Sequence, residues 1–82
     1  MDSADLMLAL RREQIAVLHA VRPVVTPAGR DIVVIFLEAT YGQHEAAQAC
    51  LRRLPGVAEV SFARHTKAIL YVLLDRSQPA RS

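Results

Sequence analysis

The segment TYGQHEAAQACLRRLPGVAEVSF, residues 40–62, contains the change of pattern that decides the fold of this chain. In its first part the apolar residues recur at helical spacing, which predicts an amphipathic helix over residues 40–54. Pro55 and Gly56 then end the helix, and alternating apolar and polar residues predict a strand over residues 57–63. A helix that turns through a short corner into a strand indicates a domain that mixes both element types.

The predicted helix has one apolar side, which consists of Ala46, Ala47, Cys50, Leu51 and Leu54. Cys50 lies in the middle of this side and has no base within sequence reach. Isolated cysteines are among the most buried residues, and a nucleophile needs an activating neighbour. We therefore expect Cys50 to be a small buried hydrophobic residue.

Two further strands flank this unit. DIVVIFLEA, residues 31–39, is rich in β-branched and aromatic residues, and AILYVLLD, residues 68–75, follows a turn at RHTK. Both strands are apolar on both faces, so we expect them at the centre of a sheet. In the strand over residues 57–63, the alternation predicts Ala58, Val60 and Phe62 on the buried side.

The N-terminal part predicts one more helix. Its apolar residues fall within a third of a helical wheel, which favours a helix over residues 4–21, with Asp2 or Ser3 as its cap and Pro23 as its stop. The segment RPVVTPAGR predicts a short edge strand over residues 24–26 and a turn over residues 27–30. The final residues, 76–82, are predicted to form a mobile tail.

The length, charge and cysteine content of the chain argue against several classes of function. The chain has 82 residues, which suits a single domain, and a net charge of +2 from ten Lys and Arg against eight Asp and Glu. No run of like charge exceeds an adjacent arginine pair, so we expect no nucleic-acid partner. The stretch LMLAL is too short and wrongly flanked for a signal peptide or a membrane span, so we expect no membrane partner. A single cysteine fits the reducing cytoplasm.

Residues 31–75 resemble a known family in the order of their elements. This order is strand, helix, LPGV corner, strand, turn and strand. The matching residues are Leu54, Gly56, Val57, Val60, Phe62, Ala68, Val72 and Asp75. This pattern resembles the heavy-metal-associated (HMA) domain family of copper chaperones and metal-pump N-terminal domains. The resemblance implies an α+β, ferredoxin-like two-layer sandwich, with a four-stranded antiparallel sheet and two helices on one of its faces.

The family continues after this hairpin with a helix and a strand, whereas here an extra segment stands in front. Because the first and fourth strands of a ferredoxin-like sheet are antiparallel neighbours, this segment can fill the missing places as a circular permutation. The element order would then be αββαββ. The alternative is that the N-terminal helix packs elsewhere, for example on a neighbouring subunit.

The family holds its metal in a G-M-T-C-x-x-C loop, and this chain reads LEATYGQ there, with Thr40 and Gln43 at the positions of the two cysteines. Neither side chain replaces a thiolate for monovalent copper, so we expect no metal or other cofactor by the family mechanism. Thr and Gln at this spacing instead predict a capping box at the start of the helix. His44, with Tyr41 and Glu45, is the remaining candidate for a harder metal, and His19 or His65 would have to join it.

Two other candidate sites are weaker. The backbone amides of residues 40–42 would suit an anion at a helix N-terminus, but Glu38 and Glu45 oppose one. The aromatic residues Phe36, Phe62 and Tyr71 suggest an RNA-reading sheet, but their neighbours are aliphatic and no Lys or Arg is interleaved, which favours core packing. Paired carboxylates, a serine triad, a phosphate loop and zinc-ligand pairs are all missing, so we expect no enzyme.

The two apolar faces of the central strands suggest a function. One face would hold Val33, Ile35, Leu37, Leu70, Val72 and Leu74, and the other Val34, Phe36, Ile69, Tyr71 and Leu73. Helices cover only one face of such a sheet, and the sequence does not show which one. Either choice leaves about five large apolar side chains uncovered, whose burial is worth on the order of 10 kcal/mol.

We take Val34, Phe36, Ile69, Tyr71 and Leu73 as the interface residues. The sequence then predicts a non-catalytic protein-interaction or accessory module that has lost its metal ligands and pairs with its own copy or another protein. One alternative is a divergent metal-binding or metal-chaperone protein with histidine and carboxylate ligands. Another is a regulatory domain that binds a small ligand or a peptide.

Overall fold

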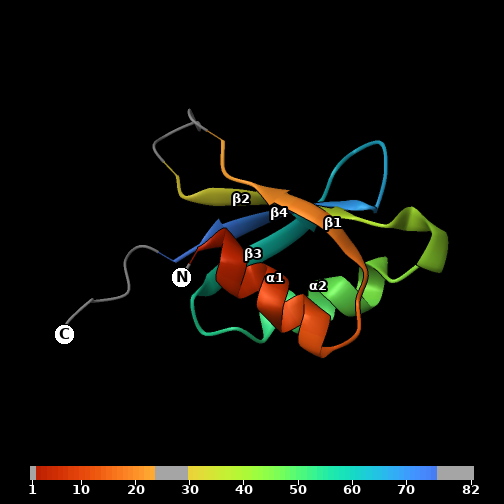
Figure 1. Ribbon diagram of the computed structural model, residues 1–82. Helices are drawn as coiled ribbons and strands as arrows, with labels where there is room; N and C mark the ends of the chain where they lie inside the picture. The colour runs from red at the N-terminus through yellow and green to blue at the C-terminus, as the bar shows by residue number, and fades with distance from the viewer. Residues whose placement is uncertain (1, 24–29, 76–82) are drawn as a thin grey trace.

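In a computed structural model of the protein, residues 2–23 and 30–75 are described. The elements in chain order are helix α1 (Ser3–Arg12), strands β1 (Val17–Val21) and β2 (Ile32–Leu37), the short 3₁₀ helix η2 (Ala39–Tyr41), helix α2 (His44–Arg52), and strands β3 (Val57–Phe62) and β4 (Ile69–Leu74). They form two layers, a sheet and a pair of helices (Figure 1).

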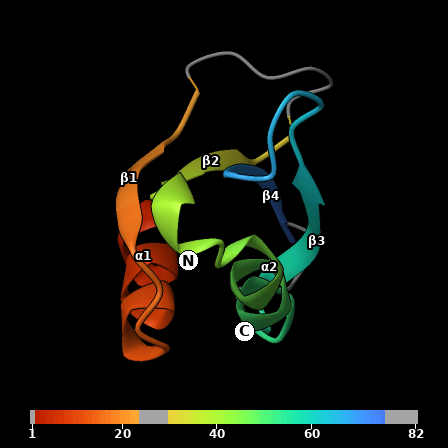
Figure 2. The ribbon, with the colours of Figure 1, turned by 90° about the vertical axis from the view of Figure 1, so that its right-hand side faces the viewer.

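The sheet has four strands in the order β1-β2-β4-β3, and every neighbouring pair is antiparallel. Both helices lie on one face of this sheet, as the turned view shows (Figure 2). β1 pairs with β2, which is the place that the fourth strand takes in a ferredoxin-like sheet. The predicted fold class is confirmed: the domain is an α+β two-layer sandwich with the permuted order αββαββ.

The hydrophobic core lies between the helices and the sheet face that they cover. Its buried members are Leu6, Leu10, Ile15, Val33, Ile35, Leu37, Ala47, Cys50, Leu51, Val60, Leu70, Val72 and Leu74. The predicted burial of Cys50 is confirmed. Since α1 contributes Leu6 and Leu10 to this core, the N-terminal helix packs within the domain and needs no neighbouring subunit to cover it.

The predicted N-terminal helix over residues 4–21 is wrong in its second half. α1 ends at Arg12, Gln14 adopts a positive φ of 60°, and Ile15 folds back into the core with its N–H bonded to the Leu10 carbonyl at 3.0 Å. Residues 17–21, VLHAV, are strand β1 because pairing satisfies the backbone of β2, which would otherwise be a bare edge. The predicted edge strand over residues 24–26 and the tail over residues 76–82 lie outside the described residues.

The start of α1 follows the sequence expectation. The Asp2 side chain accepts hydrogen bonds from the backbone N–H groups of Ala4 at 3.0 Å and Asp5 at 3.2 Å, and Asp5 accepts one from the Asp2 N–H at 3.0 Å. These reciprocal bonds form a capping box. Asp2 is therefore the cap, and the alternative, Ser3, is the first residue of the helix.

Both outer strands contain an irregular step. The register of β1 against β2 shifts between Val17 and His19, and the register of β3 against β4 shifts between Val57 and Glu59. The step in β3 corrects one prediction, because Ala58 is exposed rather than buried. One extra residue in a strand turns the following side chains to the other face.

Candidate functional site

The sheet face opposite the two helices, called the open face below, has no helix over it in the described parts of the chain (Figure 2). Burial alternates along the central strands: every second residue of β2 and β4 is buried beneath the helices, and the residues between them are partly or largely exposed. The apolar residues of the central strands on the open face are Ile32, Val34, Phe36, Ile69, Tyr71 and Leu73. All five predicted interface residues lie here.

The strand register places these side chains in continuous rows across the open face. The rows are His19–Phe36–Ile69, then Val21–Val34–Tyr71–Ser61, then Ile32–Leu73–Glu59. Directly opposed residues of neighbouring strands lie about 5 Å apart, so each row is a chain of side-chain contacts. The open face is therefore apolar along β2 and β4 and polar only toward its outer strands.

Sequence reasoning missed three members of this surface. Ile32 could have been found, because it continues the alternation of Val34 and Phe36. His19 and Val21 could not, because they fell inside the predicted helix.

One end of the open face carries a ring stack. The imidazole of His19 and the ring of Phe36 lie 4.4 Å apart between centroids, with planes inclined by 23°. His19 is exposed on the outer strand β1. The stack covers one side of Phe36 and leaves a polar ring at the edge of the face.

The other end of the open face is hollowed. The hollow has a volume of about 100 Å³ and is lined by Arg30, Ile32, Glu59, Ser61, Tyr71 and Leu73. Five of its six lining residues, all except Arg30, belong to the second and third rows, so the hollow and the ring stack lie at opposite ends of the same surface.

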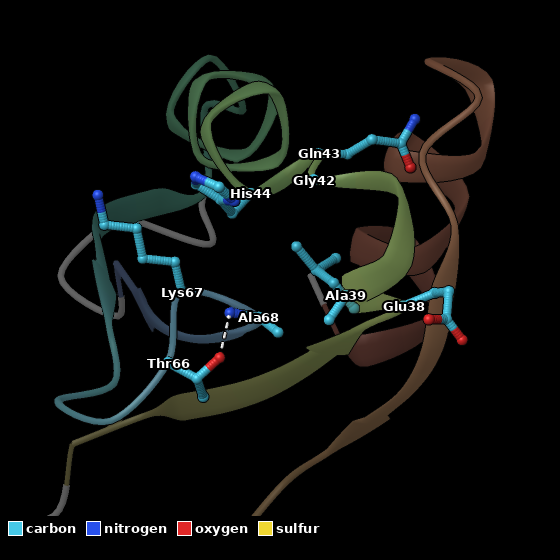
Figure 3. Close-up of a pocket in the computed structure, with 9 residues that line it drawn as sticks. Glu38, Ala39, Gly42, Gln43, His44, Thr66, Lys67 and Ala68 are labelled. Atoms are coloured by element: carbon cyan, nitrogen blue, oxygen red, sulfur yellow. Dashed lines mark hydrogen bonds between the residues drawn. The ribbon is translucent and has the colours of Figure 1, made fainter.

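A larger cavity, of about 230 Å³, lies at the edge of the domain where β2 leads into α2. Figure 3 shows it between the start of α2 and the turn before β4, with the side chains of Glu38 and Gln43 directed away from it. Two groups approach one ring there: the Lys67 ammonium lies 5.8 Å from the centroid of Phe62, and the His44 ring lies 6.0 Å from it.

The predicted capping box of Thr40 and Gln43 is wrong. α2 begins at His44, and Gln43 makes no side-chain bond to the helix start. Thr40 lies in η2, where its hydroxyl donates to the Glu38 carboxylate at 2.7 Å and its N–H donates to the same oxygen at 3.0 Å. These bonds lower the pKa of the Glu38 carboxyl. A carboxylate is a stronger acceptor than an amide oxygen, so Thr40 bonds to Glu38 instead.

Gln43 connects the loop to the segment between α1 and β1. Its Oε1 accepts from the Ala16 N–H at 2.9 Å, and its Nε2 donates to the Gln14 carbonyl at 3.0 Å. These are the backbone groups of the turn that the sequence assigned to a helix. Gln43 therefore ties the loop before α2 to the segment that leads into β1.

The metal candidates do not come together. His19 stacks on Phe36 at the open face, whereas His44 lies beside Phe62 under the helix layer, and Tyr41 is largely exposed. Within residues 2–23 and 30–75, no group of three His, Cys, Asp or Glu side chains is placed to hold a metal ion. The Cys50 Sγ lies 3.6 Å from the Ala9 carbonyl oxygen, and burial raises the pKa of its thiol.

Of the three aromatic residues, Phe62 packs against the core, as expected. The expectation of core packing is wrong for Phe36 and Tyr71, which lie on the open face because β2 and β4 turn their aliphatic partners toward the helices.

Comparison of the chain with protein-family models, with curated proteins and with solved structures returned no significant match. In the part of the chain that the structure describes, no helix has the length and apolar character needed to cross a membrane.

Proposed function

We propose that this chain is a non-catalytic protein-interaction module that pairs with a second copy of itself through the open face. The observation that supports this is the unbroken apolar surface over β2 and β4, with no helix of the described chain covering it. Contiguous apolar surface of this kind on a small domain marks an interaction site. As expected from the sequence, the role is that of an assembly or accessory subunit in the cytoplasm.

A second copy fits this surface for an electrostatic reason. The polar side chains on the open face are few and lie at its outer strands, where Glu59 and His19 occupy opposite sides. Two such faces meet without a cluster of like charge. A twofold pair also uses one patch twice, which is the commonest arrangement among soluble oligomers.

The apolar area of the open face limits the affinity with which two copies can bind each other. Six half-buried apolar side chains have about 1 kcal/mol each left to gain, so two copies gain about 12 kcal/mol. Association costs at least about 4 kcal/mol, which leaves about 8 kcal/mol and a Kd of about 1 µM at best. We therefore expect a reversible dimer rather than an obligate one.

Sedimentation velocity over about 1–200 µM tests the proposal, and we expect a concentration-dependent shift from monomer to dimer. Tyr71→Glu places a charge in the middle of the face and should weaken the pair at least tenfold, or about 1.4 kcal/mol. Leu8→Glu is the matched control, because Leu8 is 52% exposed on α1, away from the open face, and should leave the dimer unchanged. A wild-type chain that stays monomeric at the highest concentration contradicts the proposal.

We also propose that the likeness to HMA domains reflects a shared fold whose metal loop has been rebuilt as a structural contact. The support is the position of Gln43, whose amide bonds to the α1–β1 segment in place of a metal ligand. On this proposal, titration with monovalent copper or zinc, followed by native mass spectrometry, gives no stoichiometric complex.

The cavity beside α2 supports a second candidate, the binding of a small ligand with acidic oxygens. Lys67 and His44 both border it, and its volume of about 230 Å³ suits a molecule of a few heavy atoms. A thermal-shift screen of small carboxylates and phosphates should find a ligand that raises the melting temperature, and Lys67→Gln should abolish the increase. No increase with any of them leaves the interaction module as the only candidate.

A further inference from the structure

The open face has an exposed ring at one end and a hollow at the other. The stack of His19 and Phe36 stands in the first row, at the β1 side, and the hollow of about 100 Å³ lies across the second and third rows, toward β3. Between them lie Val34 and Tyr71, which form the flat middle of the face.

A twofold axis in the plane of the contact brings each spot on one copy opposite the spot of the other copy that lies equally far on the other side of the axis. Where the exposed ring of one copy then meets the hollow of the other, the reverse contact follows by symmetry. An axis that passes over the middle of the face, between the stack and the hollow, therefore fills both hollows at once. The two features make the face complementary to itself.

The chemistry of the two spots also matches. The hollow has the volume of about three water molecules, which is comparable with an imidazole ring. Its lining combines the apolar side chains of Ile32 and Leu73 and the ring of Tyr71 with the polar residues Arg30, Glu59 and Ser61. An imidazole that enters it gains an aromatic neighbour and an acceptor for its ring N–H.

We propose that in the dimer the His19 imidazole of each copy occupies the hollow of the other and donates a hydrogen bond to the partner's Glu59, while Phe36 stacks on its outer side. This docking geometry rests on the proposed function. It assigns a role to two polar residues on opposite outer strands that have no common task within one chain.

Cross-linking with a short bismaleimide tests the geometry. Within one chain, residues 19 and 59 lie on the two outer strands, about 14 Å or more apart, which is too far for a short cross-linker. In a Cys50→Ala background, the double variant His19→Cys/Glu59→Cys should form a covalent dimer with this reagent, because the reagent spans the space of the two hydrogen-bonded side chains. Each single variant should not, because the two copies of one residue are kept apart by the axis.

Cross-linking of the double variant no faster than of the single variants overturns the docking geometry. Sedimentation of the wild-type chain separates this failure from that of the proposed function. A reversible dimer without the cross-link leaves the dimer standing with another geometry, whereas a monomer rejects both.

Charge reversal provides an independent readout. His19→Glu sets a carboxylate against the partner's Glu59 and should raise the Kd about tenfold or more. Adding Glu59→Lys to the same chain should restore the Kd to within about threefold of wild type, since opposite charges then meet. Failure of the second change to restore affinity overturns the assigned contact.

Discussion

Cys50 shows how one buried thiol makes the stability of this domain depend on pH. Its side chain is 4% exposed between α2 and the Ala9 carbonyl, and burial, followed by the nearby Glu13 carboxylate, raises its pKa above the ordinary value of 9.0. The folded state therefore holds the thiol proton more tightly than the unfolded chain does.

We predict that this contribution to stability is fully present below pH 9.0 and is lost as the pH rises through the higher pKa of the folded state. Urea unfolding between about pH 7 and 10.5 measures the effect. Cys50→Ala is the control, because it should flatten the decline above the ordinary thiol pKa. A wild-type curve that matches that of the variant would contradict the prediction.

At the scale of elements, the loop between β2 and α2 allows a test of what Thr40 and Gln43 do. The two residues either cap α2 together or make separate contacts with other segments. The capping-box hypothesis expects Thr40→Ala and Gln43→Ala to cost similar amounts of stability. The structure predicts a clear difference, because Gln43 makes two bonds to the α1–β1 segment and Thr40 bonds only to exposed Glu38.

We expect Gln43→Ala to lower the free energy of unfolding by about 1 to 2 kcal/mol, since two backbone groups lose their partner. Thr40→Ala should have the small effect of an ordinary surface substitution. Chemical denaturation of both variants measures the difference. Equal losses would restore the capping-box explanation.

The elements that could be predicted from the sequence are those with one clear period. β2, β3 and β4 lie where their patterns placed them, within the usual uncertainty of their ends. The predicted helix over residues 40–54 is present as α2, but it begins only at His44, because residues 39–41 form η2 instead. β1 could not be predicted, because Val17 and Val21 are four residues apart, which fits one side of a helix as well as an alternating strand. The segment forms a strand rather than a helix because it pairs with the edge of β2, which is distant in sequence.

At the scale of the whole molecule, the sequence offers the permuted topology only as one of two alternatives, and it does not identify the uncovered face. β2 and β4 are apolar on both sides, so only the packing of α1 and α2 shows that Val33 and Leu70 face inward. The ring stack and the hollow depend on the register of all four strands, which no local pattern specifies.

A reversible dimer makes the stability of the whole molecule depend on its concentration. We predict that the melting temperature rises as the protein concentration increases from about 1 to 200 µM, because association stabilises the folded state by mass action. Differential scanning calorimetry at several concentrations measures this. The Tyr71→Glu variant should show a smaller rise over the same range, and a wild-type chain whose melting temperature stays constant would argue against the dimer.

The irregular steps in β1 and β3 have a consequence for solubility. Among the described residues, β1 and β3 have no strand beyond them, so further strands could add sideways, and Leu18, 58% exposed on β1, would favour such growth into fibres. A shifted register interrupts the regular hydrogen-bonding ladder that an incoming strand needs, and here both borders are interrupted. The two steps therefore disfavour open-ended polymerisation through the borders of the sheet.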